Sequence, residues 1–399
     1  MRETPLHVRS IRTLQRNNPF RVLGEHRNFR IFWIGQTLSL MGTWIQVMGE
    51  GWLALELTNN AFLVTLVSAV GALPVLALSM QALMLIEAIT LWIVTITGHV
   101  TIYWLLGLAA LSGIFSAFEI PARQAMMIEL VGREDLAGAI ALNSSGFNLA
   151  RIVGPAIGAV VIATAGIAWC FALNAVSYFS VLIGLYMIHL APHVERMRRP
   201  GGSEMREGIR YMLSTPEVRI LMILVTAVSV FGSPYIALMP VIARDRLGAS
   251  AGGYGSLLTA IGVGGLTGAL FLAGVGARVK RGRLLAWSTA VFAAALLALA
   301  LTRVFHVAWV ILLIAGCAMI LNGALSNALL QTLVPDEFRG RLMAAYSLVV
   351  VGLSQVMGNF LAGAVARIEG PQFAIAGGAA IIFAMVFWAF NSHRELLRL

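Results

Sequence analysis

The chain has 399 residues, of which 59% are hydrophobic and 12% are charged, and its mean hydropathy is +0.85. Soluble domains carry about a quarter charged residues, so this composition excludes an ordinary soluble protein. The formal net charge of +10 could indicate binding to nucleic acid, but the basic residues lie in short segments beside long apolar stretches. That placement is typical of membrane proteins, so we expect a lipid bilayer, and no nucleic acid, as the partner.

Residues 1–30 form a basic arm with seven arginines and no apolar run, which we expect in the cytoplasm beside anionic headgroups. From residue 31 onward, apolar stretches recur that are about long enough, as helices, to cross a hydrocarbon core of roughly 30 Å. We predict twelve spans, at 31–55, 60–79, 81–98, 102–120, 140–162, 167–190, 218–242, 254–276, 284–302, 307–329, 342–365 and 372–391.

The lysine and arginine residues fall unevenly on the two sides of these spans. Of the 28 basic residues, 23 lie on one side, four lie on the other, and Arg151 lies within a span. Because loops rich in basic residues stay in the cytoplasm, we predict a multi-pass protein of the bacterial inner membrane with both termini in the cytoplasm.

The longest polar stretch between spans, 191–217, separates the first six spans from the last six. We therefore predict a six-helix bundle over 31–190, a cytoplasmic linker over 191–217 and a second six-helix bundle over 218–399. The segments 130–134 and 333–337 have similar sequences and equivalent places in the two bundles, as expected for the internal repeats of many transporters.

The first half is short between its second and third spans. Residues 62–97 contain Glu87 as their only charged side chain. These 36 residues rise about 54 Å as a helix, against roughly 60 Å for two crossings. A single crossing would reverse every later loop, so we predict two short helices that turn near residues 79–81.

Four segments carry a resemblance to a known family, at 42–46, 52–58, 118–124 and 143–158. Together with twelve spans and a basic linker after the sixth, they make the chain similar to the major facilitator superfamily and, within it, to the enterobactin-exporter-like branch. The resemblance runs from Phe29 to about Asn391. It implies an all-α membrane protein of two pseudo-symmetric six-helix bundles, which exports a small siderophore-like or drug-like molecule by alternating access in exchange for protons.

The fifth span matches the antiporter motif of this superfamily at Gly146, Gly154, Pro155 and Gly158. Small residues let membrane helices approach closely, and proline kinks a helix. The resemblance associates this stretch with export. The alternative is that these residues serve packing alone, since membrane helices tolerate both glycine and proline.

The signature loop of the superfamily, a glycine followed by Asp-Arg and further basic residues, is absent between spans two and three. Its counterpart between spans eight and nine is present, and the resemblance implies that it forms a cytoplasmic gate with Arg278, Lys280, Arg281 and Arg283. Two interpretations stay open. The protein closes by other contacts, or it is a degenerate homologue or scaffold that does not transport.

Arg151 lies near the middle of span five, where an ionisable side chain costs at least ~2.5 kcal/mol. We expect its side chain to face the bundle interior and to pair with a carboxylate of Glu50, Glu87 or Glu119. Either that carboxylate takes up and releases a proton as the two sides alternate, or a permanent ion pair holds the helices in register.

Polar and aromatic side chains within the spans predict a substrate cavity between the halves, lined by Trp44, Gln46, Phe147, Asn148, Asn322 and Gln355. A partly polar cavity suits an amphiphilic organic substrate, although each amide could instead serve as an interhelical hydrogen bond. The sequence has no paired metal-ligand spacing and no phosphate-binding glycine loop. We therefore expect no catalytic residue, no metal and no cofactor, and a protein that is not an enzyme. We also expect the protein to be a monomer.

Overall fold

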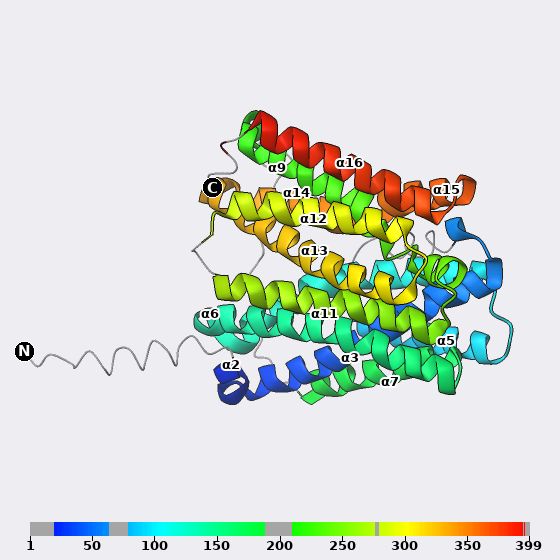
Figure 1. Cartoon of the computed structure of the whole chain (residues 1–399). Helices are drawn as coiled ribbons and strands as arrows, with labels where there is room; N and C mark the ends of the chain where they lie inside the picture. Colours follow the sequence, from blue (N-terminus) through cyan, green and yellow to red (C-terminus); the bar gives the residue numbers. More distant parts are fainter. Residues whose placement is uncertain (1–19, 64–78, 188–209, 276–278, 394, 396–399) are drawn as a thin grey trace, which may run out of the picture.

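The computed structural model describes residues 20–63, 79–187, 210–275, 279–393 and 395. Within these ranges the chain is helical and contains no strand, and its long helices lie side by side (Figure 1). Residues 1–19 of the predicted arm, most of span two, most of the linker and Arg278 lie outside the described residues.

The first half begins with a short helix and continues with four long ones, α2 Phe20–Glu25, α3 Arg27–Thr58, α5 Ser79–Ile96, α6 Ile102–Thr164 and α7 Ala168–Met187. The predicted boundaries of spans one, three and six agree with α3, α5 and α7 to within a few residues. The separation predicted between spans four and five agrees with the apolar segments Ile102–Ser116 and Gly138–Thr164, but the residues between them are also helical and belong to α6. Gly132 breaks α6 with φ 71° and ψ 175°. A residue without Cβ adopts that conformation readily, so the chain turns there without a loop.

The second half contains five regular helices, α9 Pro216–Ala227, α11 Ala251–Val275, α12 Arg281–Leu301, α13 Phe305–Leu333 and α16 Pro371–Ser392. Span seven continues from α9 through short irregular turns, η1 Val228–Gly232, η2 Ser233–Tyr235, α10 Met239–Val241 and η3 Ile242–Arg246. Span eleven consists of α14 Asp336–Ser347, the π-helical η5 Leu348–Gly358 and α15 Asn359–Ile368. Both spans were predicted as single helices, and both are interrupted.

The interruptions in spans seven and eleven have a local cause and lie against each other. Pro234 and Pro240 lack the backbone donor that a regular helix needs, and they fall within span seven. Gly358 packs so closely on η1 that a Cβ there would lie 2.6 Å from the carbonyl oxygen of Val230. Irregular backbone at membrane depth is tolerated only where protein or a cavity covers it, so these two segments face the interior of the second half.

Six helical segments in the described ranges are long and apolar enough to cross a membrane, Gly138–Thr164, Pro216–Arg246, Ala251–Gly274, Arg281–Leu301, Phe305–Leu333 and Pro371–Ser392. Large apolar side chains such as Trp287 and Phe387 are two-thirds exposed. Soluble proteins rarely expose broad apolar surfaces. The helices are therefore those of a membrane protein whose outer surface faces lipid.

The helix ends define two opposite ends of the bundle. The start of α3, the starts of α9 and α12, and the end of α16 lie together at one end, which we call the termini end (Figure 1). The end of α3 and the start of α11 lie at the opposite end, the far end. Helix α6 contacts α3 in its own half and α11 in the second half, so it is the main bridge between the halves.

Candidate functional site

Two carboxylates and two amides form a buried polar cluster inside the first half. The side-chain NH2 of Gln46 donates to Glu50 Oε1 at 2.8 Å and to Glu87 Oε1 at 3.1 Å and Oε2 at 3.3 Å. Asn174 donates to the side-chain oxygen of Gln46. Gln46, Glu87 and Asn174 are buried, and the four residues come from α3, α5 and α7. The structure therefore brings Glu50 and Glu87 together around one neutral amide.

Glu119 belongs to a second cluster, on the arm of α6 that precedes Gly132. Glu119 Oε1 lies 3.0 Å from Arg123 Nε, an ion pair between side chains one helical turn apart, and it accepts a hydrogen bond from Gln81 at 3.1 Å. Arg123 also reaches Asn143 Oδ1 at 3.5 Å, beyond the break in the helix. Arg123 was absent from the residues predicted for the site, although its i,i+4 spacing from Glu119 is a recognisable signal of a helical ion pair.

Arg151 lies on the arm of α6 that follows Gly132, and its guanidinium reaches toward the second half. A Cβ built on Gly265 of α11 would lie 3.0 Å from Arg151 Nη2. Within the described ranges Arg151 forms no ion pair, and its buried Nη2 has no hydrogen-bond partner. The structure thus does not bring Arg151 together with Glu50, Glu87 or Glu119.

The glycines of the antiporter motif mark where α6 packs tightly on α3. A Cβ at Gly146 would lie 2.6 Å from Thr37 Oγ1, and one at Gly154 would lie 2.7 Å from Trp44 Cβ. Gly158 lies likewise against Met48, with 3.0 Å between the built Cβ and the sulfur. Distances this short leave no room for a side chain, so the motif sets the close approach of these helices.

The same arm of α6 packs against the second half through glycines of α11. A Cβ built on Gly255 would lie 2.9 Å from the carbonyl oxygen of Pro155, and one built on Gly262 would lie 2.8 Å from Ile152 Cγ1. The inter-half contact therefore extends along α6 from Arg151 toward the far end. Gly264 and Gly268 lie on another face of α11, where built Cβ atoms would meet Leu313 and Cys317 of α13 in the same half.

Further contacts between the halves gather at the far end. The rings of Trp52 and Tyr254 stack with centroids 5.9 Å apart, and those of Phe62 and Phe360 meet edge to face at 5.5 Å. Arg244 donates to the side-chain oxygen of Asn59, joining the end of η3 to the end of α3. These contacts hold the halves together at the far end in the conformation described.

The residues predicted for the substrate cavity divide into three groups. Trp44 and Phe147 lie edge to face with centroids 6.0 Å apart, and Phe147 is 41% exposed. Gln46 is in the carboxylate cluster. Asn322 is buried and donates to Thr289 on α12, which is an interhelical hydrogen bond within the second half. The side chains of the remaining two predicted cavity residues, Asn148 and Gln355, lie outside the described residues.

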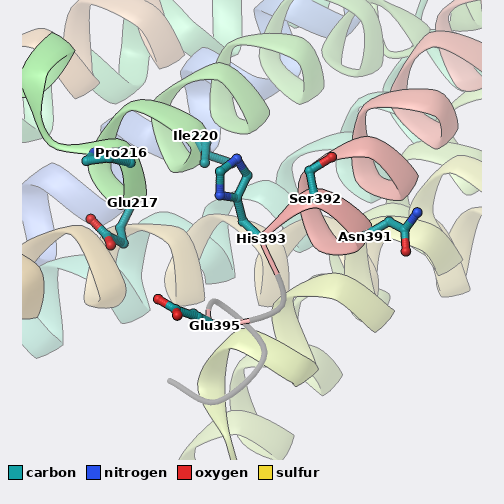
Figure 2. Close-up of a pocket in the computed structure, with 7 residues that line it drawn as sticks. All are labelled: Pro216, Glu217, Ile220, Asn391, Ser392, His393 and Glu395. Atoms are coloured by element: carbon teal, nitrogen blue, oxygen red, sulfur yellow. The ribbon is translucent and has the colours of Figure 1, made fainter.

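The predicted gate loop is described only at its end. Lys280, Arg281 and Arg283 are exposed at the termini end, where α12 begins. A pocket of about 450 Å³ lies near this end, between the start of α9 and the end of α16, and Glu217, His393 and Glu395 lie around it (Figure 2). All of its lining residues belong to the second half, so it is not a passage between the halves.

One group of side chains in the described ranges has ligand atoms close enough to share a metal ion. Ligand atoms of Glu25, His26 and Asp135 lie within 4.8 Å of one another. The contact of 2.8 Å between His26 Nε2 and Asp135 Oδ2 ties the start of α3 to α6 just beyond its break. With three ligands the group falls short of a closed tetrahedral metal site, and the His26–Asp135 contact accounts for its geometry.

Comparison with known proteins gives one family match over nearly the whole chain. The family described as "Transmembrane secretion effector" matches residues 18–396. The Staphyloferrin A transporter of Staphylococcus aureus (strain NCTC 8325 / PS 47) is 24% identical over 92% of this chain and 97% of that protein. The Enterobactin exporter EntS of Escherichia coli O1:K1 / APEC is 29% identical, over 60% of this chain and 56% of that protein.

Solved structures with the same arrangement of helices include transporters of several kinds. A bacterial homologue of the human lysosomal transporter Spinster, inward-facing and occupied, superposes with a TM-score of 0.68 at 13% identity, covering 93% of this chain and 97% of that one. A D-xylose-proton symporter superposes with a TM-score of 0.63 at 14% identity, covering 90% and 97%. At these identities the likeness shows the fold alone, and it confirms the predicted fold.

Proposed function

Because this chain belongs to the transmembrane secretion effector family of the major facilitator superfamily, we propose that it is a secondary active transporter that exports a small organic molecule in exchange for protons. Two relatives are a staphyloferrin A transporter and an enterobactin exporter. They support a siderophore-like or drug-like substrate for this chain. The uneven distribution of basic residues supports the bacterial inner membrane as its location, with the termini end in the cytoplasm.

Alternating access follows from how the halves meet. The named contacts between them run from Arg151 to the far end, through Gly255 and Gly262 of α11 and the Trp52–Tyr254 stack. Under the proposed orientation these contacts close the outer side. Rocking of the halves about the α6–α11 contact would separate the far-end contacts and open that side, as in other transporters built from two repeats.

The observation that carries proton coupling is the cluster around Gln46. Two ionised carboxylates beside one neutral amide repel each other at low dielectric, and binding of a single proton relieves that repulsion. Glu50 and Glu87 therefore form a site that can hold and release one proton. Glu119 and Arg151, which we also predicted for coupling, stay predictions, since Glu119 pairs with Arg123 in this conformation.

The test is transport by the full-length protein in proteoliposomes with an imposed pH gradient, using a panel of siderophores and lipophilic cations. We expect Glu87→Gln to abolish gradient-driven transport but to retain exchange of labelled for unlabelled substrate, which requires no net proton movement. Glu56→Gln is the matched control. Glu56 lies on α3, as Gln46 and Glu50 do, but it accepts a hydrogen bond from Trp52, which is outside the cluster. Unchanged gradient-driven transport by Glu87→Gln would remove the cluster from the mechanism.

The same assay separates the transporter from its alternative. A degenerate homologue or scaffold without the usual gate loop would move no compound of the panel under any gradient. The family match over residues 18–396 favours the transporter. We propose, further, that the protein is not an enzyme, uses no cofactor and works as a monomer, with the six-helix bundles and linker as predicted from the sequence.

A further inference from the structure

The cation on the second arm of α6 has no acceptor among the residues that the structure describes. Arg151 Nη2 is buried and lacks a hydrogen-bond partner in the described ranges. An isolated charge in an apolar interior is costly and is retained when something pairs with it. A permanent structural role would require a carboxylate or carbonyl oxygen at this nitrogen, and the described residues supply neither.

The three carboxylates predicted to pair with Arg151 interact with other side chains. Glu119 pairs with Arg123 at 3.0 Å, and both Glu50 and Glu87 accept from Gln46. Each of them therefore has a partner of its own. The missing acceptor for Arg151 must come from a different source.

The guanidinium of Arg151 lies where the two halves meet. It lies beside Gly265 of α11, where the absence of a side chain leaves room for it. Phe147 precedes Arg151 by one helical turn on α6, so the two side chains share a face of the helix. Phe147 is partly exposed and lies against Trp44.

We propose that Arg151 binds an anionic group, of the carboxylate type, on the transported molecule, with the aromatic pair Trp44–Phe147 taking an adjoining apolar part. A guanidinium offers paired donors in a planar fork that matches a carboxylate. The preferred substrates are then amphiphilic organic anions rather than lipophilic cations. This inference rests on the proposed function, because it names the chemical class of the exported compound.

Binding to the full-length protein in lipid nanodiscs tests the site without any gradient. The probes are 2-naphthylacetate and its neutral amide, 2-naphthylacetamide, which differ in charge but hardly in shape. We expect the wild type to bind the acid about tenfold more tightly than the amide, the size of one charge-assisted hydrogen bond. Arg151→Gln should remove this preference by weakening the acid alone, and Arg151→Lys should keep part of it because the charge remains.

The matched control is Arg244→Gln, which removes the same charge from the far end of the same interface and should leave the acid preference unchanged. Equal affinities of the wild type for the two probes, or no binding of either, would overturn the inference. A preference that survives in Arg151→Gln would also overturn it.

The outcome separates this inference from the proposed function. If the acid preference depends on Arg151 while no compound is transported, the anion site stands and the transporter fails. If Arg151→Gln weakens acid and amide equally while pH-driven transport by the wild type is observed, the transporter stands and the anion site fails.

Discussion

The two arms of α6 each carry a partly buried arginine, and the arginines differ in their partners. Arg123, before the break at Gly132, pairs with Glu119 of the same arm. Arg151, after the break, faces α11 of the other half and has no acceptor in the described ranges. The partners of Arg123, Glu119 and Asn143, belong to its own half, where a charge can be neutralised permanently. The second arm lies on the surface between the halves, where a permanent partner would lock the two together.

This difference matters because the halves must separate for transport to occur. A salt bridge across the interface would be broken in every cycle, and each buried charge left without its partner is costly. A cation whose partner arrives with the substrate avoids that cost in the loaded state. The comparison of the two arms therefore predicts that replacing arginine by methionine lowers stability in the first arm and raises it in the second. Three variants test the comparison in detergent-solubilised protein.

Arg123→Met should give the largest effect. It leaves Glu119 buried without its cation, and breaking one side of a buried pair costs on the order of 3 kcal/mol. The measurement is the midpoint of thermal unfolding followed by intrinsic tryptophan fluorescence. Arg123→Lys, which retains the charge, should recover much of the loss. A midpoint for Arg123→Met equal to that of the wild type would show that the first arm does not depend on this pair.

Gly154→Leu should give the next largest effect. A Cβ at Gly154 would lie 2.7 Å from Trp44 Cβ, so the side chain has no space and the helices must move apart. Overpacking of this kind costs about 2 kcal/mol. The matched control is Gly107→Leu on the first arm, where a built Cβ meets no atom within 4 Å and the midpoint should stay near that of the wild type. Similar losses for both variants would contradict close packing of the second arm on α3.

Arg151→Met should give the smallest effect, and in the opposite direction. Replacing an unpaired buried cation by an apolar side chain of similar length removes a desolvation cost, so we expect stability to rise by about 1 kcal/mol. The thermal midpoint of the unliganded protein measures this directly. A fall comparable to that of Arg123→Met would mean that Arg151 has a structural partner, and the contrast between the arms would disappear.

Much of the helix inventory was predictable from the sequence. Runs of apolar residues longer than about 18 residues have few alternatives to a membrane helix, and α7, α11, α12, α13 and α16 follow the predicted spans closely. The irregular course of span seven was signalled by Pro234 and Pro240, although their effect on the backbone depends on what covers them. The helical course of the polar segment on both sides of the break at Gly132 was not predictable, since a polar segment that follows a span is normally a loop.

The candidate site was predictable as a set of residues but not as a set of contacts. The full or partial burial of Gln46, Glu50, Glu87, Glu119 and Arg151 follows from their position within apolar stretches. Gln46 and Glu87 are 41 residues apart in the chain, and their contact depends on the rotation and tilt of two helices. Those quantities are set by packing, for which a hydropathy pattern carries no information.

The amino-acid sequence by itself determined that the chain lies in a membrane, roughly where it crosses, and which ionisable side chains enter the apolar layer. These properties depend on the transfer of each segment from water to hydrocarbon, which is a local free energy. Only the tertiary structure decided which carboxylate meets which amide and which arginine has no acceptor in the part of the chain that the structure describes. Electrostatic pairing acts over a few ångströms between different helices, so it is decided when the helices pack.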